Sequence, residues 1–255
     1  DMKEILSYDS VEISFDGKTV VHDVSFSLHP GEILGIVGES GSGKSTLLKA
    51  AMGLLGKSGM VTRGDIWFQE KDIPDLSRGE MQKICGEKIG MIFQDAGASL
   101  CPIRTIGEQI YESITAHKKM SREQAKEKAL GLFEKLKFQD GERIWNSYPF
   151  ELSGGMNQRV GIAIAMLMED EPTSALDVAV QRQVVQEMLA LRELFGTAII
   201  LVTHDIGVVS AMADSILVLK EGKVMEYGAA TQVLETPQND YTRKLLSAVP
   251  RLRRL

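Results

Sequence analysis

Apolar and polar residues alternate along the first thirty positions of the chain. The apolar side chains of Val11, Ile13 and Phe15 are separated by polar ones, an Asp16-Gly17 turn follows, and the apolar positions resume between 20 and 28. Period-two alternation interrupted by an Asp-Gly pair is typical of a β-hairpin. The start of the chain is therefore predicted to form antiparallel strands.

Short β-rich runs separated by long helical stretches occupy the rest of the chain. Residues 33–37 form an apolar run that ends in a glycine-rich loop, and residues 45–52 then have a helical pattern. Further apolar runs lie at 89–93, 198–202 and 216–219. Strands that alternate with helices in this way predict an α/β fold with a mainly parallel core sheet.

A helical segment interrupts this alternation in the middle of the chain. Residues 121–124 have the form of a capping box, and apolar side chains follow at 129, 132, 133 and 136, at helical spacing. Residues 220–223, between two apolar runs, predict a late hairpin. We expect one domain, 1–255, with a catalytic core at about 1–94 and 166–235, a helical subdomain at about 95–165 and a tail at 236–255.

Composition narrows the class of protein without identifying it. The chain has 255 residues, 44% hydrophobic and 25% charged, and a net charge of -6, which argues against nucleic-acid binding. Its longest aliphatic runs fall far short of the roughly 20 apolar residues of a membrane-spanning helix. Residues 1–10 show no signal-peptide pattern. Cys85 and Cys101 lack metal-site spacing and are interpreted as reduced packing residues.

A complete phosphate-binding loop lies between the predicted strand at 33–37 and the helix that follows. Its glycines let backbone N–H groups turn toward phosphate oxygens, and the helix directs its positive end at them. The lysine is expected to reach the β- and γ-phosphates, and the first serine of the helix to ligate Mg²⁺. The nucleotide-binding residues of this segment are Gly38, Glu39, Ser40, Gly41, Ser42, Gly43, Lys44, Ser45 and Thr46.

Three more polar elements follow in a fixed order. Ser153, Gly154 and Gly155 precede a helical stretch, a pattern that is common by itself, because serine and glycine often start helices. Asp170-Glu171 comes next; adjacent acids can divide Mg²⁺ binding and orientation of the attacking water between them. His204 follows the apolar run at 198–202, at the edge where ligands gather in open α/β sheets.

Together these motifs resemble the nucleotide-binding subunits of ABC transporters over nearly the whole chain. The resemblance implies a P-loop ABC ATPase fold with an N-terminal antiparallel β subdomain and an inserted helical subdomain. It implies that ATP and Mg²⁺ are bound, that Gln94, Glu171 and His204 are catalytic, and that Ser45, Gln94 and Asp170 hold the metal. It also assigns Ser153 to Gly155 to the signature and residues 174–177, with Asp177, to the D-loop. The resemblance implies that Phe15 stacks on adenine; the alternative is that Phe15 packs in the core.

The resemblance also implies partners. In this family the signature of one subunit closes over ATP held by another, so we expect a head-to-tail pair of ATPase subunits, of one kind or two, and poor hydrolysis by a lone chain. Two transmembrane permease subunits would dock near residues 95–103, and an extracytoplasmic solute-binding protein would deliver the solute. The expected location is peripheral, on the cytoplasmic face of the inner membrane.

Several segments are similar to the peptide and nickel importer group. They are the Met156 variant of the signature and residues 94–95, 99–102, 105–109 and 241–250. A soluble ABC ATPase is the alternative, although the chain has neither coiled coils nor tandem cassettes. A different P-loop class, such as a GTPase or a small-molecule kinase, is disfavoured, because no base-recognition motif such as Asn-Lys-x-Asp is present and such proteins have no use for the signature.

One segment departs from the family pattern. Residues 165–168 run directly into Glu169 and Asp170, where the family has an aliphatic strand, so about one strand of roughly half a dozen residues is expected to be missing. A true deletion would remove the support of the two acids. We hypothesise that the native chain carries further residues here, since every other motif is intact. An intact mass of 28.1 kDa would contradict that hypothesis.

Overall fold

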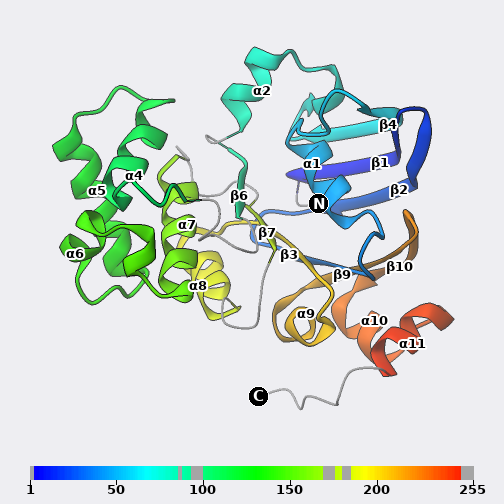
Figure 1. Ribbon diagram of the computed structural model, residues 1–255. Helices are drawn as coiled ribbons and strands as arrows, with labels where there is room; N and C mark the ends of the chain where they lie inside the picture. Colours follow the sequence, from blue (N-terminus) through cyan, green and yellow to red (C-terminus); the bar gives the residue numbers. More distant parts are fainter. Residues whose placement is uncertain (1–2, 86–87, 93–99, 169–175, 180–184, 248–255) are drawn as a thin grey trace.

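The computed structural model describes residues 3–85, 88–92, 100–168, 176–179 and 185–247. A four-stranded antiparallel sheet opens the chain, with the strand order β2-β1-β4-β5 (Figure 1). The predicted hairpin is confirmed: Phe15 pairs with Lys18 across the Asp16-Gly17 turn. The bounds are β1 Leu6–Phe15, β2 Lys18–Leu28, β4 Gly59–Phe68 and β5 Lys71–Asp72, followed by η1 Ile73–Asp75 and α2 Arg78–Ile84.

A six-stranded sheet forms the centre of the molecule, in the order β10-β9-β3-β8-β7-β6. The pairs from β9 to β6 are parallel, and β10 is antiparallel to β9. Its strands are β3 Ile33–Val37, β6 Gly90–Ile92, β7 Leu176–Ala179, β8 Ile199–Thr203, β9 Ser215–Lys220 and β10 Lys223–Ala229. The helices around it are α1 Lys44–Ala51, α8 Val185–Phe195, α9 Ile206–Met212, α10 Ala230–Glu235 and α11 Asp240–Ser247.

Alternate residues of the central strands point into two separate hydrophobic cores, as a period of two requires. Both faces of the sheet are covered, which explains why these strands are continuous apolar runs. One face, with Ile33, Leu201 and Val218, packs against α9 and the helical lobe. The other, with Leu34, Ile200 and Leu219, packs against α1 and the antiparallel sheet.

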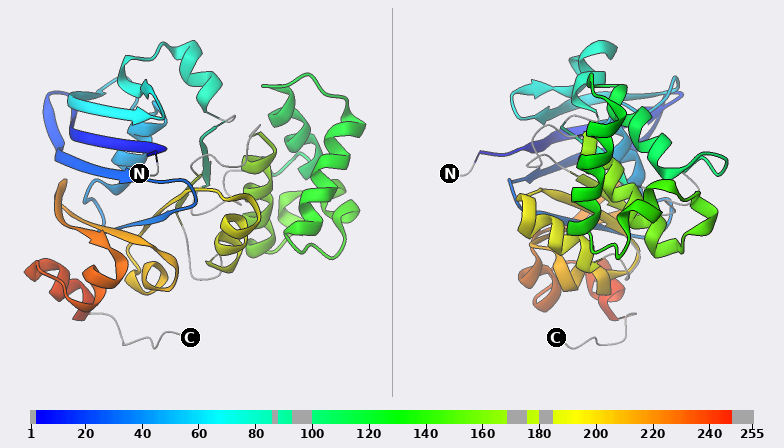
Figure 2. Two further views of the ribbon diagram at one scale, coloured as in Figure 1. Left: turned by 180° about the vertical axis from the view of Figure 1, so that it is seen from behind. Right: turned by 90° about the vertical axis from the view of Figure 1, so that its left-hand side faces the viewer.

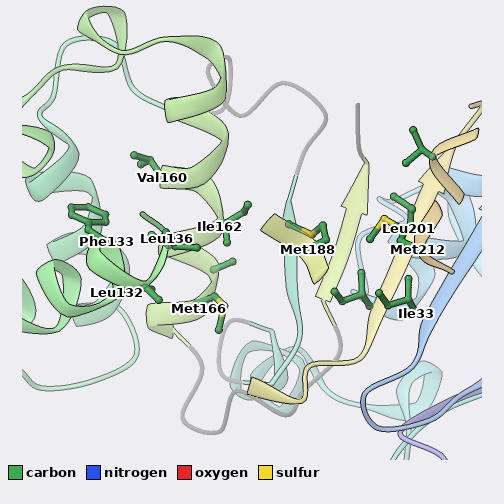
Figure 3. Close-up of a cluster of buried hydrophobic side chains, with 14 of the residues drawn as sticks. Ile33, Leu132, Phe133, Leu136, Val160, Ile162, Met166, Met188, Leu201 and Met212 are labelled. Carbon is green, nitrogen blue, oxygen red and sulfur yellow. The ribbon is translucent and has the colours of Figure 1, made fainter. Parts of the chain in front are cut away.

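The helical lobe lies to one side of the sheet in Figure 1 and in the left view of Figure 2. Figure 3 shows the first core running from Phe133 and Val160 in the lobe, past Met188, to Leu201 in the sheet. The capping box of residues 121–124 is confirmed at the start of α5. The elements of the lobe are α4 Ile106–Thr115, α5 Arg122–Lys135, α6 Gly141–Asn146, η2 Pro149–Glu151 and α7 Gly154–Met168.

Strand β8 has β3 on one side and β7 on the other. Strand β7 pairs with β8, with Leu176 opposite Ile199 and Ala179 opposite Val202. Leu176 and Asp177, predicted to belong to a D-loop, therefore lie in a core strand. Interior strands of a sheet need partners for their backbone amides and carbonyls on both sides, so the segment that follows α7 fills the gap.

Asp170 and Glu171 lie outside the described residues. The nearest described element before them is a helix, α7, which ends at Met168, and the nearest after them is β7. What was expected of these two acids therefore stays a prediction.

Candidate active site

The phosphate loop connects the end of β3 to the start of α1. Gly41 and Gly43 have φ values of 78° and 100°, a region that residues with a Cβ rarely adopt. Gly43 is the N-cap of α1 and provides no side-chain cap, so the first amides of the helix have no capping acceptor. Amides left in this way at a helix start are suited to bind an anion such as a nucleotide phosphate.

Lys44 folds back over this loop. Its Nζ donates hydrogen bonds to the carbonyl oxygens of Gly38, at 2.8 Å, and Glu39, at 2.7 Å, and to Oγ of Ser42, at 3.2 Å. Partial burial lowers the pKa of the Lys44 ammonium, and the nearby Glu39 carboxylate partly offsets this. The ammonium thus lies at the mouth of the loop, on acceptors that a phosphate can replace.

The turn between β9 and β10 is joined to the phosphate loop by a main-chain hydrogen bond. The amide of Gly222 donates to the carbonyl of Ser42, at 2.9 Å, and the amide of His22 donates to the carbonyl of Gly222, at 2.8 Å. Gly222 has a φ of 75°, and a Cβ on it would lie 2.0 Å from the carbonyl oxygen of Val20. The turn therefore joins the phosphate loop to strand β2, and only glycine fits there.

Gly38 also has no room for a side chain, and Gly38→Ala is expected to damage both folding and nucleotide binding. A Cβ on Gly38 would lie 2.1 Å from the carbonyl oxygen of Leu219, which is main chain and cannot move aside cheaply. Overpacking of this kind costs about 1–3 kcal/mol, so we expect a lower unfolding temperature and weaker ATP binding. Thermal unfolding with and without ATP measures both effects. Gly131→Ala in α5, which has open space, is the control: it should not lower the unfolding temperature, since alanine favours helix more than glycine does, and it should leave ATP binding unchanged.

His204 lies at the same edge of the sheet as the phosphate loop. It follows Thr203, the last residue of β8, and Thr203 pairs in register with Val37, the residue before Gly38. The His204 side chain is exposed. Asp205 accepts a hydrogen bond from the amide of Gly207, at 2.8 Å, and caps α9. The start of α9 thus holds the backbone beside His204 in place, facing the edge where nucleotide would bind.

The signature residues lie at the start of α7, in the helical lobe. Ser153, Gly154 and Gly155 are exposed at the start of α7, with the amide of Met156 donating to Oγ of Ser153 at 3.3 Å. Asn157 is buried and donates from Nδ2 to the carbonyl of Pro149, at 2.9 Å, which fixes this turn. Helix α7 packs against α4, α5 and β6, and lies on the lobe side of the molecule while α1 lies across the sheet (Figure 1).

The remaining predicted site residues divide into two groups. Phe15 is half-buried and packs with the second core, where its Cε1 lies 2.6 Å from the position that a Cβ would take on Gly59. Gln94, Asp170 and Glu171 lie outside the described residues. Among the residues that the structure describes, no three possible metal-ligating side chains cluster together. Ser45 is exposed on the first turn of α1.

Comparison with known proteins decides the family. The profile described as ABC transporter matches residues 21–177, more than half of the chain. The chain belongs to the ABC transporter family. It is 43% identical over 258 residues to the oligopeptide transport ATP-binding protein OppD of Salmonella typhimurium, covering 97% of this chain and 77% of OppD. It is 43% identical over 263 residues to the dipeptide transport ATP-binding protein DppD of Bacillus subtilis, covering 98% and 78%.

Solved structures of ABC cassettes share the fold. CbiO1 of Clostridium perfringens, part of an ABC transporter complex, superimposes with a TM-score of 0.77 at 26% identity, covering 97% of this chain and 96% of that one. The dimeric bacterial ABC transporter cassette MJ0796 gives a TM-score of 0.72 at 29% identity, covering 88% and 98%. The predicted P-loop ABC ATPase fold is confirmed. The chain is an ABC transporter ATPase, and the alternative of a non-transport ABC ATPase is excluded.

The same alignments contain positions at which this chain has no residue. The aligned spans of 258 and 263 positions exceed the 255 residues of this chain, so both relatives carry residues that have no counterpart here. Members of the family bind ATP with Mg²⁺, form dimers of cassettes and work with permease subunits.

Proposed function

We propose that this chain is the ATP-hydrolysing subunit of an importer of short peptides. The observation that carries the proposal is the phosphate loop, in which Lys44 rests on the carbonyls of Gly38 and Glu39 beside the uncapped start of α1. The names of the relatives OppD and DppD, at 43% identity, supply the class of solute.

The residues at the carboxyl edge of the sheet would divide the work of phosphoryl transfer. The loop amides and Lys44 bind the β- and γ-phosphates, and Ser45, Gln94 and Asp170 hold Mg²⁺, which neutralises charge on the phosphates when bound. Glu171 takes a proton from the attacking water, and Gln94 and His204 orient groups around the γ-phosphate. Phe15 contacts the adenine from the end of β1.

A second ATPase subunit would complete each site. The exposed signature, Ser153 to Gly155, lies at the start of the fifteen-residue helix α7, on the lobe side of the chain. A partner arranged head to tail would place this helix start against the phosphates bound by the other chain, where its dipole favours negative charge. The resemblance assigns Asp177 to this interface, whereas in this structure it pairs with Ile200 in strand β7, so its contribution is not part of the proposal. The two cassettes can be identical or of two kinds.

The transporter would contain further components. We propose two permease subunits that dock on the helical subdomain, at about 95–165, and a solute-binding protein that acts through them. Within the described ranges no helix is long and apolar enough to cross a membrane. We propose that the permease subunits attach the chain to the cytoplasmic face of the membrane. The core would comprise about 1–94 and 166–235, and residues 236–255 the tail.

An uptake measurement tests the proposed function. In cells whose copy of this chain carries Lys44→Ala, uptake of a labelled tripeptide should fall to background, because import depends on ATP. Cells carrying the control Gly131→Ala should import the peptide normally, and labelled free amino acids should enter both strains equally. Normal tripeptide uptake in the Lys44→Ala strain, with the chain expressed, would reject the proposal.

A further inference from the structure

A single side chain closes the loop that precedes α4, residues 101–105. Gln109, half-buried near the start of α4, accepts the amide of Cys101 on Oε1 at 2.8 Å, and its Nε2 donates to the Cys101 carbonyl at 3.1 Å. The same Nε2 donates to the carbonyl of Arg104, at 3.0 Å. The carboxamide thus joins the beginning of the loop to its end, and both of its polar atoms are paired.

The loop holds a large apolar side chain toward solvent. Ile103, between the two residues that Gln109 binds, is 83% exposed, the highest fraction among the exposed large hydrophobic residues that the structure describes. An apolar side chain this exposed adds almost nothing to the core of its own chain, because the hydrophobic gain is proportional to the area removed from water. The hydrogen bonds that order the loop therefore do not serve the burial of Ile103.

A second exposed apolar group lies on a turn, residues 147–151, that is hydrogen-bonded to the end of this loop. The amide of Ile106, the residue after the loop, donates to the carbonyl of Ser147 at 2.9 Å. Beside Ser147, the rings of Tyr148 and Phe150 stack with their centres 5.5 Å apart, and Phe150 is 72% exposed. Exposed apolar groups that gather in one part of a surface mark sites of protein contact. The loop and the turn together therefore have the character of a contact surface.

We propose that Gln109 is a positioning residue, which holds the loop 101–105 in the shape that a permease subunit contacts through Ile103. The proposal rests on the proposed function, in which permease subunits dock on the helical subdomain. Without the carboxamide, α4 keeps its capping box at Thr105 and Glu108, but the loop loses its closure. A partner that recognises Ile103 must then order the loop as it binds, and this ordering weakens the contact.

The substitution Gln109→Met tests the proposal, because methionine has nearly the same shape and makes none of these hydrogen bonds. In cells, tripeptide uptake per expressed copy of the chain should fall about three- to tenfold, the effect of one lost hydrogen bond on an equilibrium. The Kd of the purified chain for fluorescent ATP should stay within twofold of the wild type. A role limited to stability would lower the amount of chain and leave uptake per copy unchanged, and that result would overturn the proposal.

Ile103→Ala is a second variant, and its folding is not at risk because the side chain is exposed. Its unfolding temperature should equal that of the wild type, while uptake should fall as in Gln109→Met. The controls are Gln139→Met, exposed on the same lobe, and Leu54→Ala, 53% exposed after α1, and both should import normally. Wild-type uptake in Ile103→Ala, or an equal loss in either control, would overturn the proposal. If Lys44→Ala cells imported the tripeptide normally, the proposed function would fail instead.

Hydrogen exchange and membrane binding provide readouts that do not depend on transport. In the purified Gln109→Met chain, amide exchange in residues 101–105 should be faster than in the wild type, and in Ile103→Ala it should be unchanged. In cell lysates, a smaller fraction of both variant chains should sediment with the membranes that carry the permease. Equal exchange in the wild type and Gln109→Met would show that the carboxamide does not hold the loop, and equal sedimentation of all chains would exclude the permease contact.

Discussion

Lys44→Ala is expected to weaken ATP binding about 100-fold. The ammonium lies over the mouth of the loop, 2.8 Å from the Gly38 carbonyl and 2.7 Å from that of Glu39, and would exchange these acceptors for phosphate oxygens. A hydrogen bond to a charged group contributes about 1.5–3 kcal/mol, and about 2.7 kcal/mol corresponds to a 100-fold change in Kd. A titration with fluorescent ATP measures the loss.

Lys49→Ala is the control for this variant. Lys49 lies in the last turn of the same helix, α1, and its side chain is exposed. The substitution Lys49→Ala removes one positive charge from α1 at a distance from the phosphate loop. The ATP affinity of this variant should remain close to that of the wild type. An equal loss in both variants would indicate a general charge effect, and an affinity of Lys44→Ala within a few-fold of wild type would exclude this loop as the nucleotide site.

Glu171→Gln is expected to stop turnover while ATP binding persists. An amide cannot take a proton from water at neutral pH, and losing a general base typically costs about 10²–10⁴ in rate. Phosphate release should fall by that factor, the Kd for ATP should be unchanged, and ATP should trap a closed dimer on size-exclusion chromatography. Glu169→Gln, two residues away, is the matched control and should hydrolyse ATP at the wild-type rate.

The result for Glu171→Gln also bears on the order of elements around the acids. In the family pattern a core strand precedes them, whereas here α7 precedes them and β7 begins at Leu176, after them in the chain. Unchanged hydrolysis in Glu171→Gln would reject the assigned base. The relatives carry residues that have no counterpart in this chain. That the native chain has further residues before Asp170 stays a prediction. An intact mass of 28.1 kDa would contradict it.

Local sequence patterns predicted those strands and helices that are bounded by turn or capping residues. The predicted strand at 33–37, bounded by a glycine-rich loop, has the same bounds as β3 in the structure. The capping box at 121–124 starts α5 as expected. Strand β4 and the capping boxes that start α2 and α4 were not predicted. Strand β4 contains Gly59 and Gly64, and its apolar and polar residues do not alternate regularly. Most of its residues are exposed or half-buried. Its pairing with β1 therefore depends on tertiary contacts.

The sequence by itself determined the phosphate loop, because glycines with positive φ, a lysine and a helix start are local features. It also determined the family, through the order of its motifs. Only the tertiary structure decided which segment lies beside β8, since an interior strand is chosen by the unpaired backbone on both sides of it and not by its own pattern. The structure also placed the Gly222 turn beside the phosphate loop. Contacts between residues about two hundred positions apart depend on the packing of the whole chain, which no local pattern records.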